Sequence, residues 1–212
     1  MKKIKMLIAD DHPIVREGYK KILSATADMI VTDEAENGKE VLECVRKKEY
    51  DLILLDISMP GRSGLETLKD VKSEKPKTPV LILSIYPEEQ YAIRAFRAGA
   101  SGYLTKASAP NELIAAIRKI SNGGRYISPS MAEKLTYYLD MDSVKPLHET
   151  LSDREYQVML MIASGKTVGE IADELCLSVK TISTYRTHII EKMKLKNNAE
   201  ITLYAIQNKL VG

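Results

Sequence analysis

The sequence predicts an α/β domain with a five-stranded, doubly wound parallel sheet, followed by an all-α domain of four helices. Five short apolar runs in the first half alternate with segments whose apolar residues recur at helical spacing. Such alternation is typical of a parallel sheet with right-handed crossovers. From about residue 150 only helical patterns remain. The 212 residues are enough for two domains that each bury a core.

The composition is that of an ordinary soluble globular protein, with 44% apolar and 28% charged residues. The net charge of +2 does not identify a partner. Cys44 and Cys176 lie far apart without metal-type spacing, which favours a reducing compartment and no disulfide framework. No apolar stretch approaches the roughly 20 residues that span a bilayer. We therefore expect a cytoplasmic protein without a membrane partner.

The elements of the first half follow in regular order. Each predicted strand is an apolar run bounded by polar or turn-forming residues. We expect strands over residues 6–9, 29–35, 52–55, 79–84 and 102–105. Each strand is followed by a helical stripe, within residues 14–22, 41–45, 65–71, 91–96 and 113–120. Pro13 and Pro110 suit the first turns of their helices.

Polar residues stand where these strands end. The third strand runs directly into Asp56, and Pro60-Gly61 then forms a turn. Alone, Asp56 is equally well explained as a cap of the following loop. In a parallel sheet, however, the carboxyl ends of the strands share the edge where ligands bind. Four strands bring polar side chains to this edge: Asp10, Asp11, Asp56, Ser84 and Lys106.

These residue types suit phosphoryl chemistry. Clustered carboxylates match the oxygen ligands that Mg²⁺ prefers, and their mutual repulsion calls for a cation. An aspartate can act as a nucleophile and form an aspartyl phosphate. Mg²⁺ and Lys106 would stabilise the charge of the transferring group. Alone, Lys106 would be a solvated surface lysine and Ser84 a locally bonded hydroxyl, but the whole cluster favours a site.

Residues 4–122 resemble the receiver domain of bacterial two-component response regulators, which has a flavodoxin-like fold. The family pattern of Asp, two residues, Met-Pro, three residues and Gly is met by Asp56, Met59, Pro60 and Gly64. The acidic pair, Ser84 and Lys106 also match. The segment Asp-Asp-His-Pro-Ile-Val-Arg-Glu-Gly, residues 10–18, is similar to the NarL/FixJ subgroup.

The resemblance implies that Asp56 accepts a phosphoryl group from a sensor histidine kinase. It also implies a Mg²⁺ site formed by Asp10, Asp11, Asp56 and the backbone carbonyl of Ser58. Ser84 would turn its hydroxyl toward the phosphoryl oxygen, and Tyr103 would move into the space that Ser84 vacates. Ala107 follows Lys106 where the family usually has proline, often after a cis bond. A cis bond before a non-proline residue costs about 3 kcal/mol, which leaves the geometry of this bond open.

The composition changes after the first domain. Gly123-Gly124 ends the fifth helix, and Ser128-Pro129 opens a predicted short helix that could pack on either domain. The following segment is polar and irregular to about Glu149. We therefore predict a receiver over residues 1–124, a linker with a short helix over 125–148, and an all-α domain over 149–212.

Capping boxes at Ser152–Glu155 and Thr167–Glu170 begin the first two helices of the second domain. A short turn leads to a third helix from about Val179 to Met193, and a fourth covers about 199–208. A short helix, a tight turn and a longer helix form a helix-turn-helix pattern. Because short helix pairs are common, this pattern alone is a weak signal.

The third helix has two distinct faces. Its apolar face, which we expect to pack inward, carries Ile182, Tyr185, Ile189 and Met193. The opposite face carries Lys180, Ser183, Thr184, Thr187 and Glu191. A small polar face suits insertion into the major groove, although it also fits an ordinary solvated face.

The charge distribution of the second domain favours DNA. Residues 150–177 hold two Lys/Arg and five Asp/Glu, a net −3, whereas residues 178–212 hold six and two, a net +4. The basic charge thus begins with the third helix, as contact with phosphates requires. We expect Lys192 and Lys194 near the DNA backbone, together with Lys196.

Residues 149–212 resemble the LuxR-type helix-turn-helix, and a receiver followed by this domain is the NarL/FixJ arrangement. The matching segments include Leu151–Glu155, Ile162–Lys166, Glu170–Ala172, Thr181-Ile182 and Lys192-Met193. The resemblance implies that Lys180, Ser183, Thr184 and Thr187 face double-stranded promoter DNA. It implies a regulator that dimerises when phosphorylated, with RNA polymerase as a further partner and no enzymatic activity beyond its own phosphorylation and dephosphorylation. Two alternatives remain: an aspartate-nucleophile phosphatase, and a regulator controlled by partner binding rather than phosphorylation.

Overall fold

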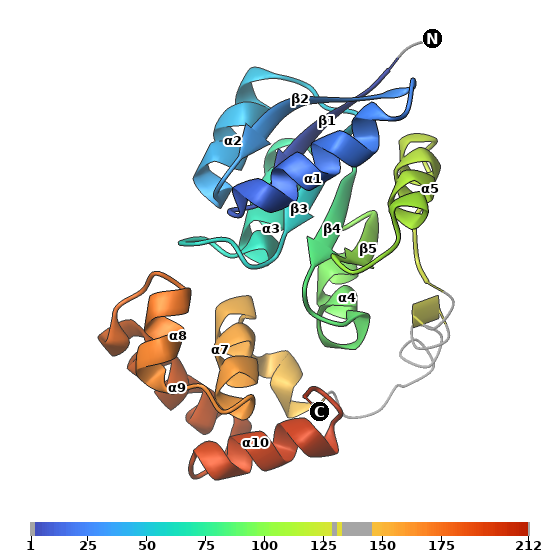
Figure 1. The fold of residues 1–212 in the computed structure, drawn as a ribbon. Helices are drawn as coiled ribbons and strands as arrows, with labels where there is room; N and C mark the ends of the chain where they lie inside the picture. The colour runs from blue at the N-terminus through green and yellow to red at the C-terminus, as the bar shows by residue number, and fades with distance from the viewer. Residues whose placement is uncertain (1–2, 129–130, 133–145, 212) are drawn as a thin grey trace. The chain divides into compact units, whose positions relative to one another are not determined.

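The computed structural model describes residues 3–128, 131–132 and 146–211 (Figure 1). The chain divides into two compact units, Met1–Tyr138 and Leu139–Gly212, which we call the receiver unit and the output unit. Most of the predicted short helix after Ser128 lies outside the described residues.

The receiver unit contains the predicted five-stranded parallel sheet, in the order β2-β1-β3-β4-β5. This is the flavodoxin-like order of a doubly wound sheet, so the predicted fold class is confirmed. The strands are β1 (Ile4–Ala9), β2 (Met29–Ala35), β3 (Leu52–Asp56), β4 (Val80–Ser84) and β5 (Gly102–Thr105). Pro79 precedes β4 instead of opening it, as expected for a residue that cannot donate a backbone hydrogen bond.

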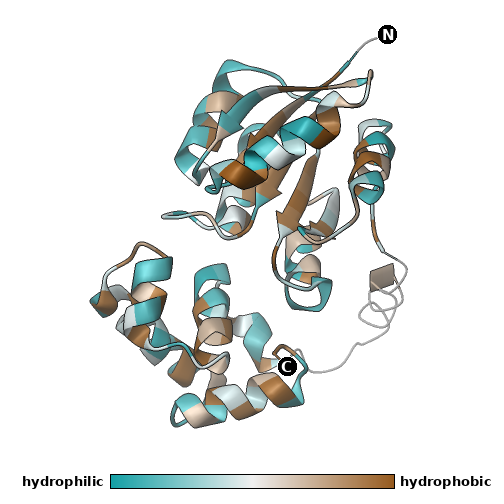
Figure 2. Cartoon of the chain, viewed as in Figure 1, coloured by the Kyte–Doolittle hydropathy of each residue, from teal (hydrophilic) through white to brown (hydrophobic). Residues whose placement is uncertain are grey.

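Five helices cover the two faces of this sheet: α1 (Pro13–Ser24), α2 (Gly38–Lys47), α3 (Gly64–Glu74), α4 (Glu88–Arg97) and α5 (Pro110–Ser121). α1 and α5 pack on one face, where Leu23 and Ile117 join a core with Ile8, Leu54 and Leu83. α3 contacts both α2 and α4, and these three helices cover the opposite face. Figure 2 shows the consequence in hydropathy, with apolar strands between helices that are apolar on one side only.

The strand register places the polar residues at one edge. Ala9 pairs with Leu55, Asp56 pairs with Leu83, and Ser84 pairs with Thr105. Because all pairs are parallel, the last residues of β1, β3, β4 and β5 lie side by side. The residues that follow them therefore start their loops from the same edge.

The start of the predicted linker is attached to the receiver unit. Tyr126 forms a parallel bridge with Gly102, and its amide donates to the Ser101 carbonyl at 2.9 Å. Its hydroxyl donates to Glu112 at 2.8 Å, and the Ser128 hydroxyl hydrogen-bonds Glu88. Residues 126 and 128 therefore contact β5 and the first turns of α4 and α5.

The described part of the output unit is helical, as predicted. It consists of η1 (Leu147–Thr150), α7 (Asp153–Ala163), α8 (Val168–Glu174), α9 (Val179–Met193) and α10 (Asn198–Gln207). Both predicted capping boxes are present, and Ser178 caps α9 through the Thr181 amide at 3.0 Å. Tyr156, Ile171, Ile182 and Ile201 from four different helices are buried in its core.

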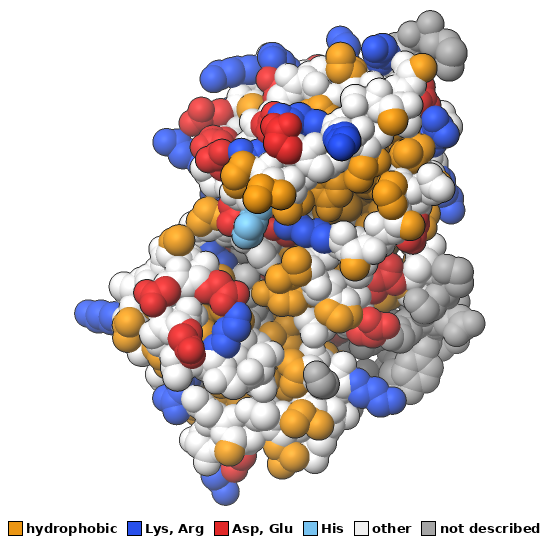
Figure 3. Space-filling model, in the orientation of Figure 1, with side chains coloured by type: hydrophobic (Ala, Val, Ile, Leu, Met, Phe, Trp, Pro, Cys, Tyr) orange, Lys and Arg blue, Asp and Glu red, His pale blue; other side chains and the backbone are white. Residues whose placement is uncertain are grey.

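The surfaces of both units are mixed in character. Figure 3 shows acidic and basic side chains interspersed with apolar ones on the visible face of each unit. Among the described helices, none combines the length and apolar character needed to cross a membrane.

Candidate functional site

Lys106 connects two of the predicted carboxylates at the edge of the sheet. Its Nζ lies 2.7 Å from Asp56 Oδ2 and 2.7 Å from Asp10 Oδ2. Both aspartates are almost fully buried, with 1% of their surface exposed. Burying two carboxylates side by side requires a compensating cation, which Lys106 supplies from the loop after β5. The structure thus brings three of the predicted site residues together.

The cation beside Asp56 does not fully offset the effect of burial on its carboxyl. Burial raises the pKa of its carboxyl above the ordinary value, and the Lys106 cation only partly opposes that effect. The Oδ1 atom is buried and has no hydrogen-bond partner among the described residues. Burial also acts to lower the pKa of Lys106, but Asp56 and Asp10 outweigh it, and the pKa of the ammonium is raised. Lys106 therefore neutralises Oδ2 of Asp56, whereas Oδ1 has no hydrogen bond of ordinary geometry within the described chain, although the Ser58 backbone also acts to lower the pKa of the carboxyl.

The acidic pair is joined by a histidine that sequence reasoning did not select. Asp10, Asp11 and His12 offer ligand atoms within 4.8 Å of one another. His12 Nδ1 lies 2.8 Å from Asp11 Oδ1, and the His12 amide donates to Asp10 Oδ1 at 3.0 Å. Asp56 is not part of this group. Carboxylate oxygens are the ligands that Mg²⁺ prefers, so the acidic pair fits a hard divalent cation.

Arg16 is a second residue that sequence reasoning did not single out. It is 7% exposed and extends from α1 beneath the acidic pair. Its guanidinium donates to the Asp10 carbonyl at 2.7 Å and to Glu34 at 3.0 Å, and it also pairs with Glu36 at 2.6 Å. A buried guanidinium with several acceptors is geometrically fixed. Arg16 therefore ties the backbone of Asp10 to β2 and the loop after it.

Ser84 is the last residue of β4, and Tyr103 lies within the adjacent strand β5, paired with Ile82. The Ser84 hydroxyl is buried and accepts a hydrogen bond from the Tyr86 amide at 3.1 Å. Tyr103 is 1% exposed, and its hydroxyl donates to the Tyr86 carbonyl at 2.9 Å. Burial raises the pKa of Tyr103, so that the hydroxyl stays protonated. Tyr103 thus already occupies an inner position, whereas the resemblance implies that it reaches one after phosphorylation.

The loop after β3 is held close to Asp56 by a glycine. A Cβ at Gly64 would lie 2.0 Å from the Asp56 carbonyl oxygen and 2.6 Å from Ile57 Cα. Only glycine allows α3 to begin so close to the strand end. Ser63 then caps α3 in a capping box with Glu66. This close approach fixes the loop that carries Ser58.

The bond after Lys106 has an ordinary conformation. No peptide bond between described residues is cis, so the one joining Lys106 to Ala107 is trans. The Lys106 amide donates to the Ser84 carbonyl at 2.7 Å, which continues the pairing of β4 and β5. The alanine is therefore compatible with the observed position of the lysine.

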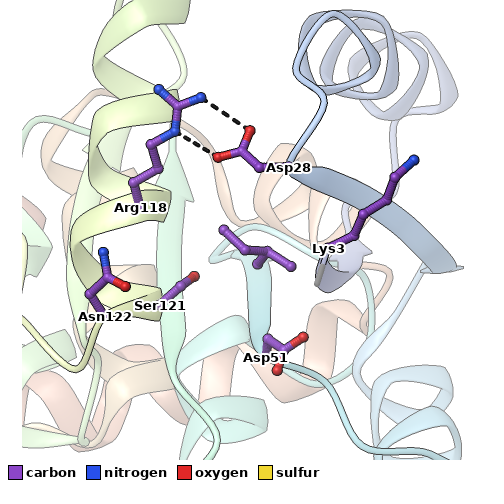
Figure 4. A pocket seen from close by; sticks show the side chains of 7 residues that line it. Lys3, Asp28, Asp51, Arg118, Ser121 and Asn122 are labelled. Carbon is purple, nitrogen blue, oxygen red and sulfur yellow. Dashed lines mark hydrogen bonds and ion pairs between the residues drawn. The ribbon is translucent and has the colours of Figure 1, made fainter. Parts of the chain in front are cut away.

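A separate hollow lies at the opposite, amino ends of the strands (Figure 4). It is lined by Lys3, Ile4, Asp28, Asp51, Arg118, Ser121 and Asn122. Asp28 and Arg118 face each other across it with two hydrogen bonds of 2.9 and 3.1 Å. Their charges compensate each other, and none of the predicted site residues lines this hollow.

In the output unit, α9 has the two faces that the sequence predicts. Ile182, Ile189 and Met193 are buried, with Tyr185 partly exposed. The four predicted DNA-facing residues are all exposed: Lys180, Ser183, Thr184 and Thr187. The hydroxyls of Thr184 and Thr187 donate to the carbonyls one turn earlier, at 3.0 and 3.1 Å. The face is therefore free of partners from neighbouring helices in the described residues.

The two lysines near the end of α9 differ from each other. Lys192 Nζ lies 2.7 Å from Glu155 Oε2 and 2.8 Å from Oε1, so it is engaged with α7. Lys194 is exposed and ends the helix in a left-handed conformation with φ of 55°. Sequence reasoning grouped both with the basic surface, because the contact with Glu155 spans 37 residues of chain.

Comparison with known proteins identifies both units. Residues 6–118 match the response regulator receiver domain, and residues 149–205 match the luxR family of bacterial regulatory proteins. The chain is 38% identical to the response regulator GacA of Pseudomonas protegens, with 98% of both chains covered. It is 37% identical to the oxygen regulatory protein NreC of Staphylococcus carnosus, covering 98% of this chain and 99% of NreC.

Solved structures give the same result. The chain resembles RcsB of Salmonella typhimurium with a TM-score of 0.69 and 26% identity, over 98% of this chain and 99% of RcsB. It also resembles RcsB bound to promoter DNA in the presence of the phosphomimetic BeF₃⁻, with a TM-score of 0.61, 26% identity, and 96% and 98% coverage. The family is one of DNA-binding regulators rather than phosphatases. The chain therefore belongs to the NarL/FixJ response regulators of two-component systems, with a receiver domain and a LuxR-type helix-turn-helix.

Proposed function

We propose that this chain is a transcription regulator controlled by phosphorylation of Asp56. A sensor histidine kinase supplies the phosphoryl group, and the phosphorylated form dimerises on promoter DNA. Residues 1–124 act as the receiver, 125–148 as the linker and 149–212 as the DNA-binding domain. The observation that carries the proposal is the position of Lys106, which lies 2.7 Å from both Asp56 and Asp10.

The chemistry follows from the two oxygens of Asp56. Oδ1, the oxygen without a donor, attacks the phosphorus of the phosphohistidine; an O–P bond forms, the N–P bond breaks and the imidazole leaves. Asp10, Asp11, Asp56 and the Ser58 carbonyl would hold Mg²⁺, which would supply positive charge against the phosphoryl oxygens. Lys106 holds Oδ2 and donates to the developing charge. Water later cleaves the aspartyl phosphate, which releases phosphate and restores the carboxylate.

The switch consists of Ser84 at the end of β4 and Tyr103 in the adjacent strand β5. The Ser84 hydroxyl turns from the Tyr86 amide toward the phosphoryl oxygen. Tyr103, which is already buried, then shifts further inward into the space that Ser84 vacates. Phosphorylation thus shifts a population between two arrangements of the Ser84–Tyr86 loop.

In the DNA complex, α9 enters the major groove. Lys180, Ser183, Thr184 and Thr187 face the bases and their flanking phosphates, and Lys194 lies near the backbone. Two copies related by a two-fold axis read two half-sites. RNA polymerase is a further partner at the promoter, and the protein works in the cytoplasm.

The test of the phosphorylation site uses a small phosphodonor with Mg²⁺. Wild-type protein is expected to gain the mass of one phosphoryl group, and Asp56→Asn is expected to gain none. Equal gain in both proteins, or in neither, refutes the assignment of Asp56. Omitting Mg²⁺ should abolish the gain, and an undiminished gain would refute the metal requirement.

The control of DNA binding is tested separately. Bound genomic DNA is mapped for wild-type protein, with and without the phosphodonor, and for Asp56→Asn. Stronger occupancy only in phosphorylated wild type supports the proposal. Equal occupancy in all three states instead supports a regulator that is controlled by partner binding. Lys180→Ala combined with Thr184→Ala should weaken specific binding, and an unaltered footprint refutes the assigned face.

A further inference from the structure

Glu155 is a buried carboxylate in the output unit whose two oxygens are both engaged. Its side chain is 4% exposed. Oε2 accepts from the Ser152 amide at 2.8 Å, which completes the capping box of α7. Lys192 Nζ contacts both oxygens, at 2.7 and 2.8 Å, and His188 Nδ1 lies 3.4 Å from Oε1. The carboxylate thus joins the first turn of α7 to the last turns of α9.

The ion pair between Glu155 and Lys192 is the directional part of the contact between α7 and α9. The apolar contacts of Ile182, Ile189 and Met193 bury α9 but tolerate small rotations and shifts, since apolar attraction is non-directional. Charge-assisted hydrogen bonds to a fixed carboxylate do not tolerate them. Ser152 holds that carboxylate in place through the cap. Lys192 therefore defines how far α9 is rotated about its own axis.

The position of Lys192 on the helix separates it from most of the predicted DNA face. At about 100° per residue, its side chain lies roughly 140° around α9 from Thr187, about 180° from Ser183 and about 80° from Thr184. It lies next to the buried Ile189, one turn along the helix. The contacts with Glu155 direct its ammonium toward α7, away from Ser183 and Thr187.

We infer that Lys192 is a positioning residue for DNA recognition, acting through Glu155, and that it is not a phosphate contact. The inference rests on the proposed placement of α9 in the major groove. A phosphate contact and a positioning contact both lower the affinity when they are removed. They differ in salt dependence, because each lost phosphate contact reduces the slope of log K against log salt concentration by about 0.9.

The experiment measures the affinity of the full-length, phosphodonor-treated protein for a genomic fragment that wild type selects, over a series of salt concentrations. Lys192→Gln and Glu155→Gln are each expected to lower the affinity for DNA about tenfold, while the slope of log K against log salt concentration stays that of wild type. The two effects should be similar, because the residues contact each other and act as one coupled pair. The double variant should be no weaker than either single variant. Lys192→Arg, which keeps charge and reach, should stay within about threefold of wild type, and circular dichroism should show folded helices in all variants.

Lys194→Gln is the matched control, two residues further along the chain. As a proposed phosphate contact, Lys194 should give a slope smaller by about 0.9 per bound subunit when it is replaced. A similar drop in slope for Lys192→Gln would overturn the inference, as would unchanged or increased affinity in Glu155→Gln. If the double variant Lys180→Ala, Thr184→Ala binds DNA as wild type does, the proposed placement of α9 in the major groove is refuted. That result is distinct from a refutation of the positioning role of Lys192, which depends on the salt slope of Lys192→Gln.

Discussion

Each unit of this chain contains a buried carboxylate that pairs with a lysine, and the two pairs behave in opposite ways. In the receiver unit, Asp56 shares Lys106 with Asp10, and its Oδ1 has no partner among the described residues. In the output unit, Glu155 has Lys192 on both oxygens and the Ser152 amide on one. Burial dominates at Asp56 and raises its pKa, whereas at Glu155 the donors outweigh burial and the pKa is lowered.

The difference shows what separates a reactive carboxylate from a structural one. Both are almost completely buried, so burial alone does not distinguish them. The number of donors does: a carboxylate with all its oxygens satisfied has nothing left to offer a ligand. Asp56 keeps an unsatisfied oxygen at the edge of the sheet, which is a cost to the fold and a requirement for the proposed chemistry.

The largest expected effect concerns the lysine of the receiver unit. Lys106→Met removes the cation that pairs with the carboxylates of both Asp56 and Asp10. We expect phosphorylation by a small phosphodonor to slow by about 10²- to 10³-fold, the effect of losing one preorganised donor. Time courses followed by intact mass spectrometry measure this rate. Lys20→Met, which removes a partly buried lysine of α1 that pairs with Glu17 and Glu34, should change the rate little. A rate for Lys106→Met close to wild type would remove Lys106 from the site.

The next effect tests the structural pair. Glu155→Ala leaves Lys192 without its partner and removes half of the capping box of α7. We expect the output unit to lose about 2 kcal/mol of stability, less than for fully buried pairs because Lys192 is half-exposed. Native-state hydrogen exchange of the α7 amides reports the loss. Glu170→Ala is the matched control, since Glu170 has the same place in the capping box of α8 but is solvent-exposed. Equal losses in the two variants would show that capping alone accounts for Glu155.

A smaller effect, on Mg²⁺ affinity, is expected at Arg16, whose guanidinium donates a hydrogen bond to the Asp10 carbonyl. Arg16→Leu should weaken Mg²⁺ binding by about tenfold, the range found when a partner behind the metal ligands is lost. Calorimetric titration with Mg²⁺ measures the affinity. Lys20→Leu removes the other cation that pairs with Glu34 without touching Asp10. If both variants bind Mg²⁺ equally well, Arg16 does not orient the acidic pair.

The smallest effect is a pair of opposite pH dependences. The pKa of Glu155 is lowered from 4.5, so its stabilisation is present above pH 4.5 and is lost as the pH falls through the folded value. The pKa of Asp56 is raised from 3.8, so its burial opposes folding at neutral pH, and this opposition fades as the pH falls toward 3.8. Acid titrations of stability for wild type, Glu155→Gln and Asp56→Asn should therefore diverge in opposite directions. Parallel curves would show that the two carboxylates do not differ.

Much of the receiver could be predicted because its signals are local. The apolar runs, the turn after Asp56 and the rule that parallel strands end at one edge place Asp10, Asp56, Ser84 and Lys106 together before any coordinates are known. The same reasoning predicts the two faces of α9, since helical spacing alone defines them.

The remaining contacts depend on how elements meet in space. Arg16 reaches Glu34 and Glu36 across 18 and 20 residues, and Lys192 reaches Glu155 across 37. No periodicity in the sequence indicates which acid a given lysine or arginine will meet. Charge counting therefore assigned Lys192 to the basic surface, although the packing of α9 on α7 directs it to a carboxylate. The signal that could have found it is the capping box, which marks Glu155 as a fixed acceptor.

The glycine at the start of α3 has a consequence for genetics. Gly64 offers no chemistry, but a Cβ there would meet the Asp56 backbone at 2.0 Å. Gly18 of α1 belongs to the segment of residues 10–18 that resembles the NarL/FixJ subgroup. A Cβ added at Gly18 would meet no atom within 4 Å. In a library of random substitutions selected for signalling, we expect Gly64 to be as intolerant as Asp56, and Gly18 to accept alanine freely. Intolerance of substitution in this family would then mark two different things, the groups that react and the spaces that must stay empty around them.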